Sequence, residues 1–402
     1  MRHFLLLSFA LLAGPACSGQ AVDASAGVVR VYTPHSQALV APVVEAFGAA
    51  TKVRTEVVTM ESALVLEKLR GEQRAAGTSG LTRTESVVWW GADEIALEQA
   101  AVEGLLAPLQ PSWARGLAAA HHNARDLWSA QFLAPFAVVH RRGVGALPAR
   151  FEDLASPAFR GRLLLRLPTD SWQMRLLLGA VLEPRMREAG GSSERAFDWF
   201  AMLDNNRVDE FFLKSDQMLE RLASAGYSQG PGDLTIWTAS EAARLRDREG
   251  YAIGFTVPVG SPAYLEGVAI VAGSLDLRPA EQFVDFIGRD EFLAGYVQQG
   301  KIPLPITRVE LDALPGWMGE AYRNARLPDR AVVASHISEW MALFEQRLRS
   351  GATPASSAED GATFWLTLFD VVGTLLIVAV LFYVLRKGRW RTGGDAESGA
   401  RA

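Results

Sequence analysis

The chain has 402 residues, a formal net charge of −5 and a pI near 5.8. This length is enough for two ordinary domains, because single cores tend to stop growing at roughly 250–300 residues. Nothing in the acidic balance resembles the basic surface that nucleic-acid binding needs, so we exclude nucleic acid as a partner.

The N-terminus has the pattern of a secretory signal peptide. Arg2 and His3 precede an apolar run from Phe4 to Ala13 that is too short to span a bilayer, and small residues follow as far as Cys17. We therefore expect residues 1–17 to be a signal peptide and the body to be exported. Cys17 is the only cysteine, so the body has no disulfides or thiol chemistry, and lipidation of Cys17 stays an open alternative.

The body alternates short β-branched runs with amphipathic helical runs. The runs VVRVYTP, VRTEVVTM and SVVWWGA are each followed by apolar residues at helical spacing. Such strand-then-helix pairs predict a mainly parallel sheet with helices on both faces. The alternation continues through GRLLLRLP, DLTIWTAS and EGVAIVAGS to a helical tail.

The C-terminal part carries a second membrane signal. Residues 350–363 are small, polar and proline-broken, which is typical of a flexible linker. Residues 364–385 form a predicted transmembrane helix of about 33 Å, against roughly 30 Å of hydrocarbon. Four basic residues follow at once, so we expect residues 386–402 to be a cytoplasmic tail. Asp370 inside this helix either snorkels or is protonated, or contacts a partner helix.

Five segments of the body occur in an order found in one known family. They are VRVYTPHSQALVAPVVEAF, SVVWWGADEIALEQAAVEGLLAPL, LPARFEDLASPAFRGRLLL, SPAYLEGVAIVAGS and AEQFVDFI…FLAGYVQQGKIPL. Together they resemble the extracellular solute-binding proteins of bacterial ABC importers, in the type II branch that includes ferric-ion, thiamine, phosphonate and sugar-phosphate binders. The resemblance implies an α/β fold of two lobes, with mixed, mainly parallel sheets, two crossing strands and a ligand cleft between the lobes. It also implies an ABC permease in the cytoplasmic membrane as partner.

The resemblance places the domain boundaries. Residues 28–133 would form the first part of lobe 1, residues 134–257 lobe 2, and residues 258–349 the return to lobe 1 with the helical tail. Two features depart from the family pattern. A transmembrane helix is added, and the adjacent tyrosine pair that ferric-binding members use is missing, since all seven tyrosines are isolated.

Ligands of open parallel sheets bind beyond the carboxyl ends of the strands, where helix N-termini offer free N–H groups. This rule selects loop residues of the first lobe, each with an alternative structural role. Asp93 is either a helix N-cap or a ligand contact, Ser36 caps or donates its hydroxyl, and His35 is otherwise a structural group. The selected residues are Pro34, His35, Ser36, Glu61, Ser62, Trp90, Gly91 and Asp93.

The same rule selects residues in the middle and at the end of the body. Hydroxyl groups beside a predicted helix start suit an oxyanion, while Trp172 either stacks on a ligand or belongs to the core. Glu266 is either a cleft carboxylate or an ordinary surface charge. The selected residues are Thr169, Asp170, Ser171, Trp172, Trp237, Thr238, Tyr264 and Glu266.

The predicted function is capture of a small solute at the extracytoplasmic face of the cytoplasmic membrane, for delivery to the permease. Candidate ligands are a phosphorylated or other organic anion, a thiamine-like cation and ferric ion. The sequence shows no Gly-x-Ser-x-Gly elbow, metal-binding histidine pair or phosphate loop, so we expect a non-enzyme without cofactor, catalytic residues or a metal site. A membrane-bound sensor that works with a partner protein, and less favourably an exported hydrolase, are the alternatives.

Overall fold

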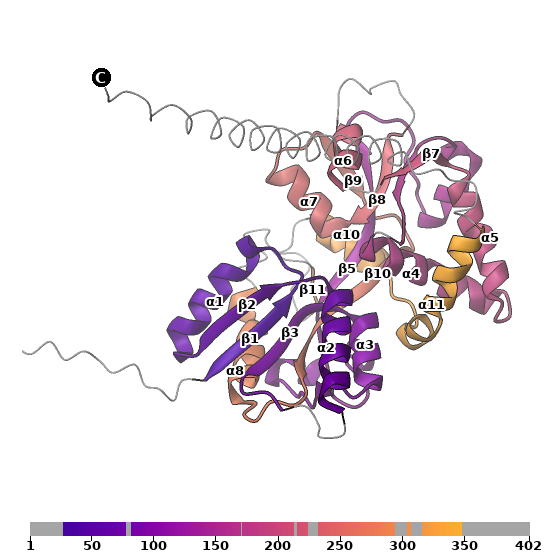
Figure 1. Ribbon diagram of the computed structural model, residues 1–402. Coiled ribbons are helices and arrows are strands. Elements are labelled where there is room, and N and C mark those ends of the chain that lie inside the picture. The colour runs from indigo at the N-terminus through magenta and orange to yellow at the C-terminus, as the bar shows by residue number, and fades with distance from the viewer. Residues whose placement is uncertain are drawn as a thin grey trace, which may run out of the picture.

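The computed structural model describes residues 27–77, 82–169, 171–212, 215–223, 232–293, 304–306 and 316–347. Two lobes are visible, one at the lower left and one at the upper right of Figure 1. The predicted signal peptide 1–17, linker 350–363, transmembrane helix 364–385 and tail 386–402 lie outside the described residues. Within the described ranges, no helix combines the length and the apolar character needed to cross a bilayer.

Lobe 1 begins with three strand–helix pairs, as the alternation predicted. β1 pairs in parallel with β2 on one side and with β3 on the other. Helices α1 and α8 lie on one face of these strands, and α2 and α3 lie on the other (Figure 1). The elements are β1 (Val28–Thr33), α1 (Gln37–Thr51), β2 (Arg54–Thr59), α2 (Ser62–Ala76), β3 (Ser86–Asp93), α3 (Glu94–Val102), β4 (Leu106–Ala107), α8 (Arg278–Ile287) and β11 (Leu304–Pro305).

Two long strands run between the lobes. β5 (Ser129–Arg141) and β10 (Ser261–Val271) are antiparallel neighbours, with Ala263 opposite Pro135. β10 pairs with β3 of lobe 1, and the far half of β5 pairs with β8 and β9 of lobe 2. The two crossing strands that the family resemblance implied are therefore present, and they make one continuous sheet of the order β2-β1-β3-β10-β5-β8-β6-β7.

Lobe 2 repeats the strand–helix alternation around β6, which is parallel to both β7 and β8. The segment FEDLASPAF forms two short 3₁₀ helices, because Pro157 follows the first of them and cannot continue a helix. The elements are η4 (Phe151–Ala155), η5 (Pro157–Phe159), β6 (Leu163–Arg166), α4 (Trp172–Glu188), α5 (Ser193–Asp204), β7 (Arg207–Phe212), α6 (Ser215–Ala223), β8 (Leu234–Thr238), α7 (Ala239–Asp247) and β9 (Ile253–Thr256).

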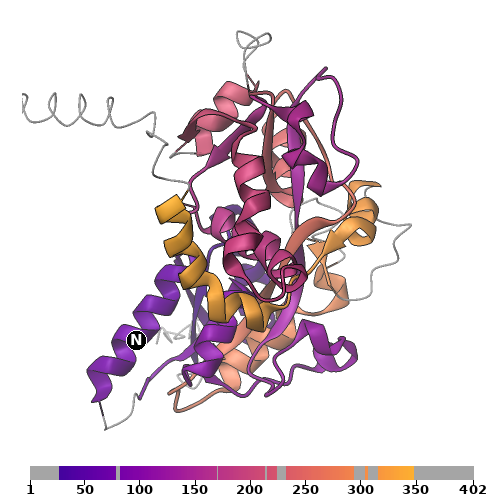
Figure 2. The same ribbon diagram turned by 90° about the vertical axis from the view of Figure 1, so that its right-hand side faces the viewer.

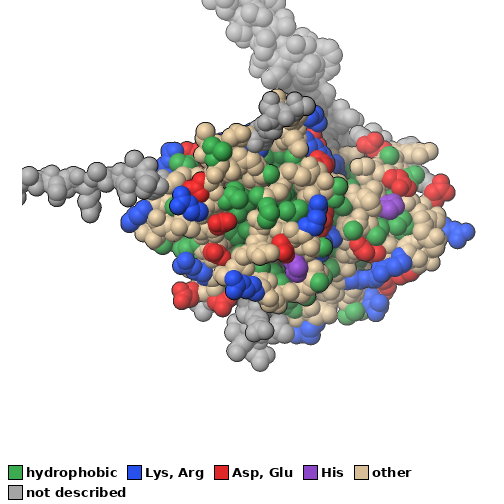
Figure 3. Space-filling model, turned by 90° about the horizontal axis from the view of Figure 1, so that it is seen from below, with side chains coloured by type: hydrophobic (Ala, Val, Ile, Leu, Met, Phe, Trp, Pro, Cys, Tyr) green, Lys and Arg blue, Asp and Glu red, His purple; other side chains and the backbone are tan. Residues whose placement is uncertain are grey.

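The remaining elements link or flank the lobes. Two 3₁₀ helices precede β5, and three elements end the described chain. They are η2 (Ser112–Gly116), η3 (Ala119–His121), α10 (Gly316–Asn324), β12 (Ala325–Arg326) and α11 (Arg330–Arg347). The end of lobe 1 that faces the viewer in Figure 3 carries interspersed basic and acidic side chains.

Helix α11 departs from the predicted domain assignment, which gave residues 258–349 to lobe 1 and its tail. Its apolar residues Val333, Trp340 and Phe344 lie in the core of lobe 2 with α4 and α5. The indole N–H of Trp340 donates to Ser193 Oγ at 3.1 Å. The reason is packing: these side chains recur at helical spacing and are buried in a cluster made mainly by α4 and α5, to which Ile95 of α3 also belongs. Figure 2 shows α11, in yellow-orange, beside α4 and above α3.

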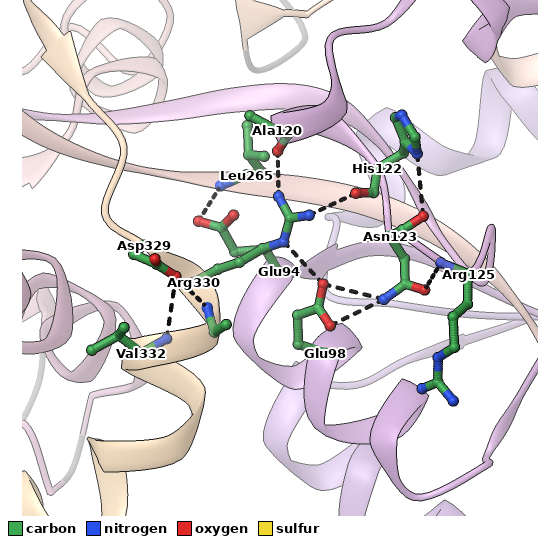
Figure 4. Close-up of polar contacts among 11 residues, drawn as sticks. Glu94, Glu98, Ala120, His122, Asn123, Arg125, Leu265, Asp329, Arg330 and Val332 are labelled. Carbon is green, nitrogen blue, oxygen red and sulfur yellow. Dashed lines mark hydrogen bonds and ion pairs between the residues drawn. The ribbon is translucent and has the colours of Figure 1, made fainter.

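The first residue of α11 nevertheless reaches back to lobe 1 (Figure 4). Arg330 Nε donates to Glu98 Oε1 of α3 at 2.9 Å, and its other nitrogens donate to the carbonyl oxygens of Ala120 and His122. The guanidinium group also lies 5.0 Å from the centre of the Trp128 ring. Helix α11 is therefore a third connection between the lobes, besides β5 and β10.

Candidate functional site

A cleft of about 680 Å³ lies between the two lobes, at the carboxyl ends of strands from both. It brings together most of the residues that the strand-end rule selected. These are Pro34, His35, Ser36, Glu61, Ser62, Gly91, Asp93, Ser171, Trp172, Trp237, Thr238, Tyr264 and Glu266. These residues converge because each lobe contains parallel strands, and the carboxyl ends of parallel strands lie at the same edge of a sheet.

Asp93 occupies the centre of the lobe 1 wall. It ends β3 and caps α3, since its Oδ1 accepts a hydrogen bond from the backbone N–H of Ala96 at 2.9 Å. The capping role and the cleft position are thus combined in one residue. Its Oδ2 accepts a hydrogen bond from Trp172 Nε1 at 2.7 Å, which connects lobe 1 directly to the first residue of α4.

Burial raises the pKa of Asp93 to about 6, although the hydrogen bonds from Ala96, Trp172 and Ser62 oppose the shift. Its side chain is 2% exposed. The carboxylate is therefore held by donors on two sides but remains poorly hydrated. Such a group interacts strongly with any charge that enters the cleft, because the local dielectric is low.

Glu266 lies beside Asp93, directly opposite it in the antiparallel pairing of β10 and β3. Its Oε1 accepts a hydrogen bond from the Tyr264 hydroxyl at 3.3 Å. Burial raises the pKa of Glu266 to about 8; the Tyr264 hydroxyl opposes this shift, and the charge of Asp93 adds to it. Tyr264 is itself buried, and desolvation followed by the charge of Glu266 raises its pKa well above the ordinary value.

Gly91 has a specific steric reason to be glycine. Its φ is +77°, and a Cβ built there would overlap the imidazole ring of His35. That ring packs edge-on against Trp90 and Phe132, with centroids 5.1 and 6.0 Å away. Burial lowers the pKa of His35 to about 4, so the imidazole is neutral near pH 7. The space beside the Gly91 backbone is thus occupied by a side chain of the same lobe, that of His35.

Helix N-termini surround the cleft, and only some of their capping side chains are engaged. Ser171 caps α4 by accepting from the N–H of Met174. Ser36 and Thr238 occupy the N-cap positions of α1 and α7, but neither side chain makes a capping hydrogen bond. Glu61 has the same position at α2, and burial raises its pKa, although the nearby charge of Arg166 opposes the shift.

Two described residues of the predicted set lie away from the cleft lining. Trp90 is fully buried and donates its indole N–H to Gln131 at 2.7 Å inside the lobe 1 core, so its predicted place in the cleft was wrong. The physical reason is that helices cover both faces of β3, which leaves neither neighbouring tryptophan on an open face. Thr169 is partly buried with its Oγ1 enclosed, and it does not line the cleft. Asp170 lies outside the described residues.

The sequence reasoning missed the basic side chains of the cleft. Arg166 ends β6, while Arg244 and Arg248 lie one turn apart on and just after α7. Arg166 could have been found, because it ends a strand like the selected residues. Arg244 is paired with Glu241 and Glu249. Further lining residues that were not predicted are Leu39, Gln173, Leu176, Ser240 and Glu241.

No group of three or more His, Cys, Asp or Glu side chains with the spacing of a metal site occurs in the part of the chain that the structure describes. The cleft instead combines carboxylates of lobe 1 with guanidinium groups, two tryptophan side chains and one carboxylate, that of Glu241, of lobe 2. This lining can hold a small polar molecule by charge, hydrogen bonds and aromatic contact.

Comparison with known proteins agrees with this arrangement. No family model matches the chain. A probable ABC transporter periplasmic-binding protein, y4fP of Sinorhizobium fredii, is 26% identical over 263 residues, which cover 61% of this chain and 68% of that protein.

Solved structures of similar fold cover most of the chain. Iron-bound HitA from Pseudomonas aeruginosa superposes with a TM-score of 0.63 at 17% identity, covering 79% of this chain and 98% of that one. Trichodesmium IdiA (FutA), in complex with iron and citrate, gives 0.62 at 15% identity, with 80% and 99% covered. AfuA from Actinobacillus pleuropneumoniae, with bound fructose-6-phosphate, gives 0.59 at 18% identity, with 81% and 100% covered. The chain therefore has the same two-lobed fold as these periplasmic binding proteins, with a cleft between its lobes, and its sequence is similar to that of a probable periplasmic-binding protein of an ABC transporter.

Proposed function

We propose that the chain captures a small solute in the interlobe cleft, outside the cytoplasmic membrane, and presents it to an ABC permease. The observation that carries this proposal is the convergence of strand-end residues from both lobes upon one cleft. Neither lobe encloses the cleft alone, so a solute that contacts both walls stabilises the closed arrangement of the lobes. Binding then shifts the population toward that arrangement, by the difference in affinity between the open and closed states.

The crossing strands suit such a motion. β5 and β10 each continue from one lobe into the other and are paired with each other, with one register shift between Glu266 and Gly267. Bending of this two-stranded bridge near Pro135 and Ala263 would move the lobes relative to each other, with α11 as a further connection. The Asp93–Trp172 hydrogen bond, which also crosses between the lobes, is a contact that closure makes or tightens. These features support capture by hinge closure, in which the solute itself undergoes no chemical change.

A membrane tether is the second part of the proposal. Residues 364–385 have the length and composition of a spanning helix, and the basic residues after them favour a cytoplasmic end. The linker 350–363 would then hold the two lobes close to the permease. Carbonate-washed membranes should retain the full chain and release a chain that ends at residue 349; release of both would remove the tether from the account.

The binding proposal is tested by thermal unfolding of the full chain in detergent, with iron(III) citrate, thiamine or fructose 6-phosphate added. A bound solute at about 100 times its dissociation constant should stabilise the fold by about 2.7 kcal/mol. Ser36→Trp, which fills the cleft from an exposed position, should abolish the shift. Ala41→Trp, on an exposed part of α1 away from the cleft, should preserve it. A shift that survives in the Ser36→Trp variant would contradict binding in the cleft.

A further inference from the structure

We infer that the captured solute carries a positively charged organic group, which lies against Asp93 and Glu266 on the lobe 1 wall. This inference rests on the proposed capture function and narrows its substrate class. It selects organic cations, of the ammonium or aromatic-cation type, over solutes that carry only negative charge. Four observations support it, and each concerns the described residues.

The first observation is the register of the two carboxylates. Glu266 and Asp93 are directly opposite in neighbouring antiparallel strands. Opposite residues in such a pair project from the same face with Cβ atoms about 4.5–5.5 Å apart, and like charges in these positions repel. Both residues line the cleft. This repulsion disfavours ionisation of Glu266. A cation between the two groups favours the ionised form of both, whereas an anion at the same place adds to the repulsion.

The second observation concerns hydrogen-bond donors. Both oxygens of Asp93 already accept bonds, from Ala96 and from Trp172. Glu266 accepts only the long bond from Tyr264 on Oε1, and its Oε2 is buried without a hydrogen-bond partner among the described residues. A buried carboxylate oxygen without a donor is costly, and a cationic N–H or N–CH₃ group supplies the missing favourable contact.

The third observation is the aromatic wall opposite the carboxylates. Trp172 and Trp237 line the cleft from lobe 2 and are partly buried. The indole N–H of Trp172 is engaged by Asp93, and the guanidinium group of Arg175 lies 5.2 Å from the centre of the same ring, so Trp172 already holds one cation beside the carboxylate. Tryptophan rings attract cations through their faces, and this attraction is strongest where water is excluded. Carboxylates and indole rings therefore favour the same kind of ligand group.

The fourth observation limits the role of the arginines. Arg244 Nε donates to Glu241 Oε2 at 2.9 Å, and a second nitrogen pairs with Glu249, so its charge is balanced within α7 and its end. Arg166 and Arg248 also line the cleft, on the side of lobe 2. They can face a polar or anionic end of the solute. The acidic groups that line the cleft from lobe 1 are Glu61, Asp93 and Glu266, beside the hydroxyl groups of Ser36 and Ser62 and the neutral imidazole of His35.

The test compares probes that differ in charge, using the full chain in detergent. The probes that carry a cationic group are choline, thiamine and phosphocholine, the last of which also carries a phosphate. The neutral counterpart of choline is 3,3-dimethylbutan-1-ol, which has the same shape without the charge. The anions are fructose 6-phosphate and inorganic phosphate. We expect at least one cation to bind, as measured by titration calorimetry, and the neutral and purely anionic probes to bind at least about 30-fold more weakly.

Isosteric variants locate the cation. Glu266→Gln and Asp93→Asn each remove a carboxyl group that can carry a negative charge toward the cation, and asparagine still caps α3. Each substitution should lower the affinity for the cationic probe by at least about 30-fold. Glu94→Gln is the matched control, because Glu94 is equally buried and adjacent to Asp93 but bonds the N–H of Leu265 outside the cleft lining. It should change the affinity by no more than about twofold.

The outcomes separate this inference from the proposed function. If an anion binds tightly and its affinity is the same for the parent chain and for both the Glu266→Gln and Asp93→Asn variants, the cationic site is overturned but solute capture still stands. Equal affinities for choline and for the uncharged 3,3-dimethylbutan-1-ol would also overturn the cationic site. This comparison needs only the parent chain, so it holds even if a variant fails to fold. Absence of binding by every probe, iron(III) citrate included, would instead count against capture itself.

Discussion

The Gly91–His35 contact shows how a single residue shapes the lobe 1 wall. Gly91 combines a φ of +77° with a neighbouring imidazole ring that occupies the place of a Cβ atom. Gly104 has a similar φ of +72° but open space around the same position. Substitution of Gly104 therefore introduces backbone strain alone, whereas substitution of Gly91 introduces both backbone strain and steric overlap with His35.

Gly104→Ala should lower the free energy of unfolding by about 1 kcal/mol, the cost of a left-handed conformation for alanine. Gly91→Ala should cost at least about 1–3 kcal/mol more, because overpacking adds to the strain. Urea unfolding of the full chain measures both values. A double variant with His35→Ala should recover most of the additional loss. Equal effects of the two single substitutions would show that the imidazole is not a constraint.

Burial of Glu266 makes the stability of the folded chain depend on pH, and the direction of this dependence follows from the raised pKa. Its pKa of about 8 in the folded chain lies above the ordinary value of about 4.5, because burial disfavours the charged form. The folded state therefore holds a proton that the unfolded state releases between these values. The contribution of Glu266 to stability is complete below about pH 4.5 and is lost as the pH rises through 8.

The unfolding free energy of the parent chain, relative to the Glu266→Gln variant, should fall by at least about 1 kcal/mol between pH 5 and pH 8.5. Glu72→Gln is the control. Burial opposes ionisation of Glu72, but its ion pairs with Lys68 and Arg83 prevail and lower its pKa, so it stays charged throughout this range. The difference in unfolding free energy between the parent chain and the Glu72→Gln variant should be independent of pH. A flat profile for Glu266→Gln would mean that Glu266 is ionised and hydrated.

At the scale of elements, sequence patterns predicted the strand–helix pairs and the strand-end loops well. Asp93 was selected because a strand is followed by a helix start, and it has both the capping and the cleft position. Trp90 could not be placed from alternation alone, because both faces of its strand are covered by helices of distant sequence. Arg244 and Arg248 were missed because their approach to the cleft depends on how α7 packs in lobe 2.

Helix α11 illustrates the same limit. It was assigned with residues 258–349 to lobe 1 and its tail, and only tertiary packing determines that its apolar residues enter the lobe 2 core while Arg330 contacts lobe 1. Arg330 and Glu98 are largely buried, with 19% and 16% of their side chains exposed. Removal of one partner leaves the other without its counter-charge and leaves two carbonyl groups without a donor.

Arg330→Ala should therefore lower the free energy of unfolding by about 2–4 kcal/mol. Arg330→Lys should restore only part of this, because an ammonium group cannot reproduce the guanidinium fork that reaches Glu98 and both carbonyls. Arg278, which pairs with Asp276 and is 83% exposed, is the control. Its replacement by alanine should leave the unfolding midpoint unchanged. Similar midpoints for both arginine variants would remove the interlobe role of Arg330.

At the scale of the whole molecule, two lobes share one sheet and three connections, namely β5, β10 and α11. The cleft between them depends on this arrangement, since its walls come from residues far apart in the sequence. The sequence indicated which turns face a common edge, but the width of the cleft and the hydrogen bond from Trp172 to Asp93 follow from how the lobes sit on the crossing strands.

The most direct test of solute capture is the distance between the lobes with and without solute. The body contains no cysteine, so a chain with Cys17→Ser accepts dyes only at introduced sites. Leu64→Cys on α2 and Met202→Cys on α5 are suitable, since these residues are 59% and 48% exposed on different lobes. Leu64→Cys with Leu275→Cys, both on lobe 1, gives a control pair. Energy transfer between the lobes should increase on saturation with a bound solute, while the control pair stays constant. A solute that binds without any change in the interlobe distance would contradict capture by closure.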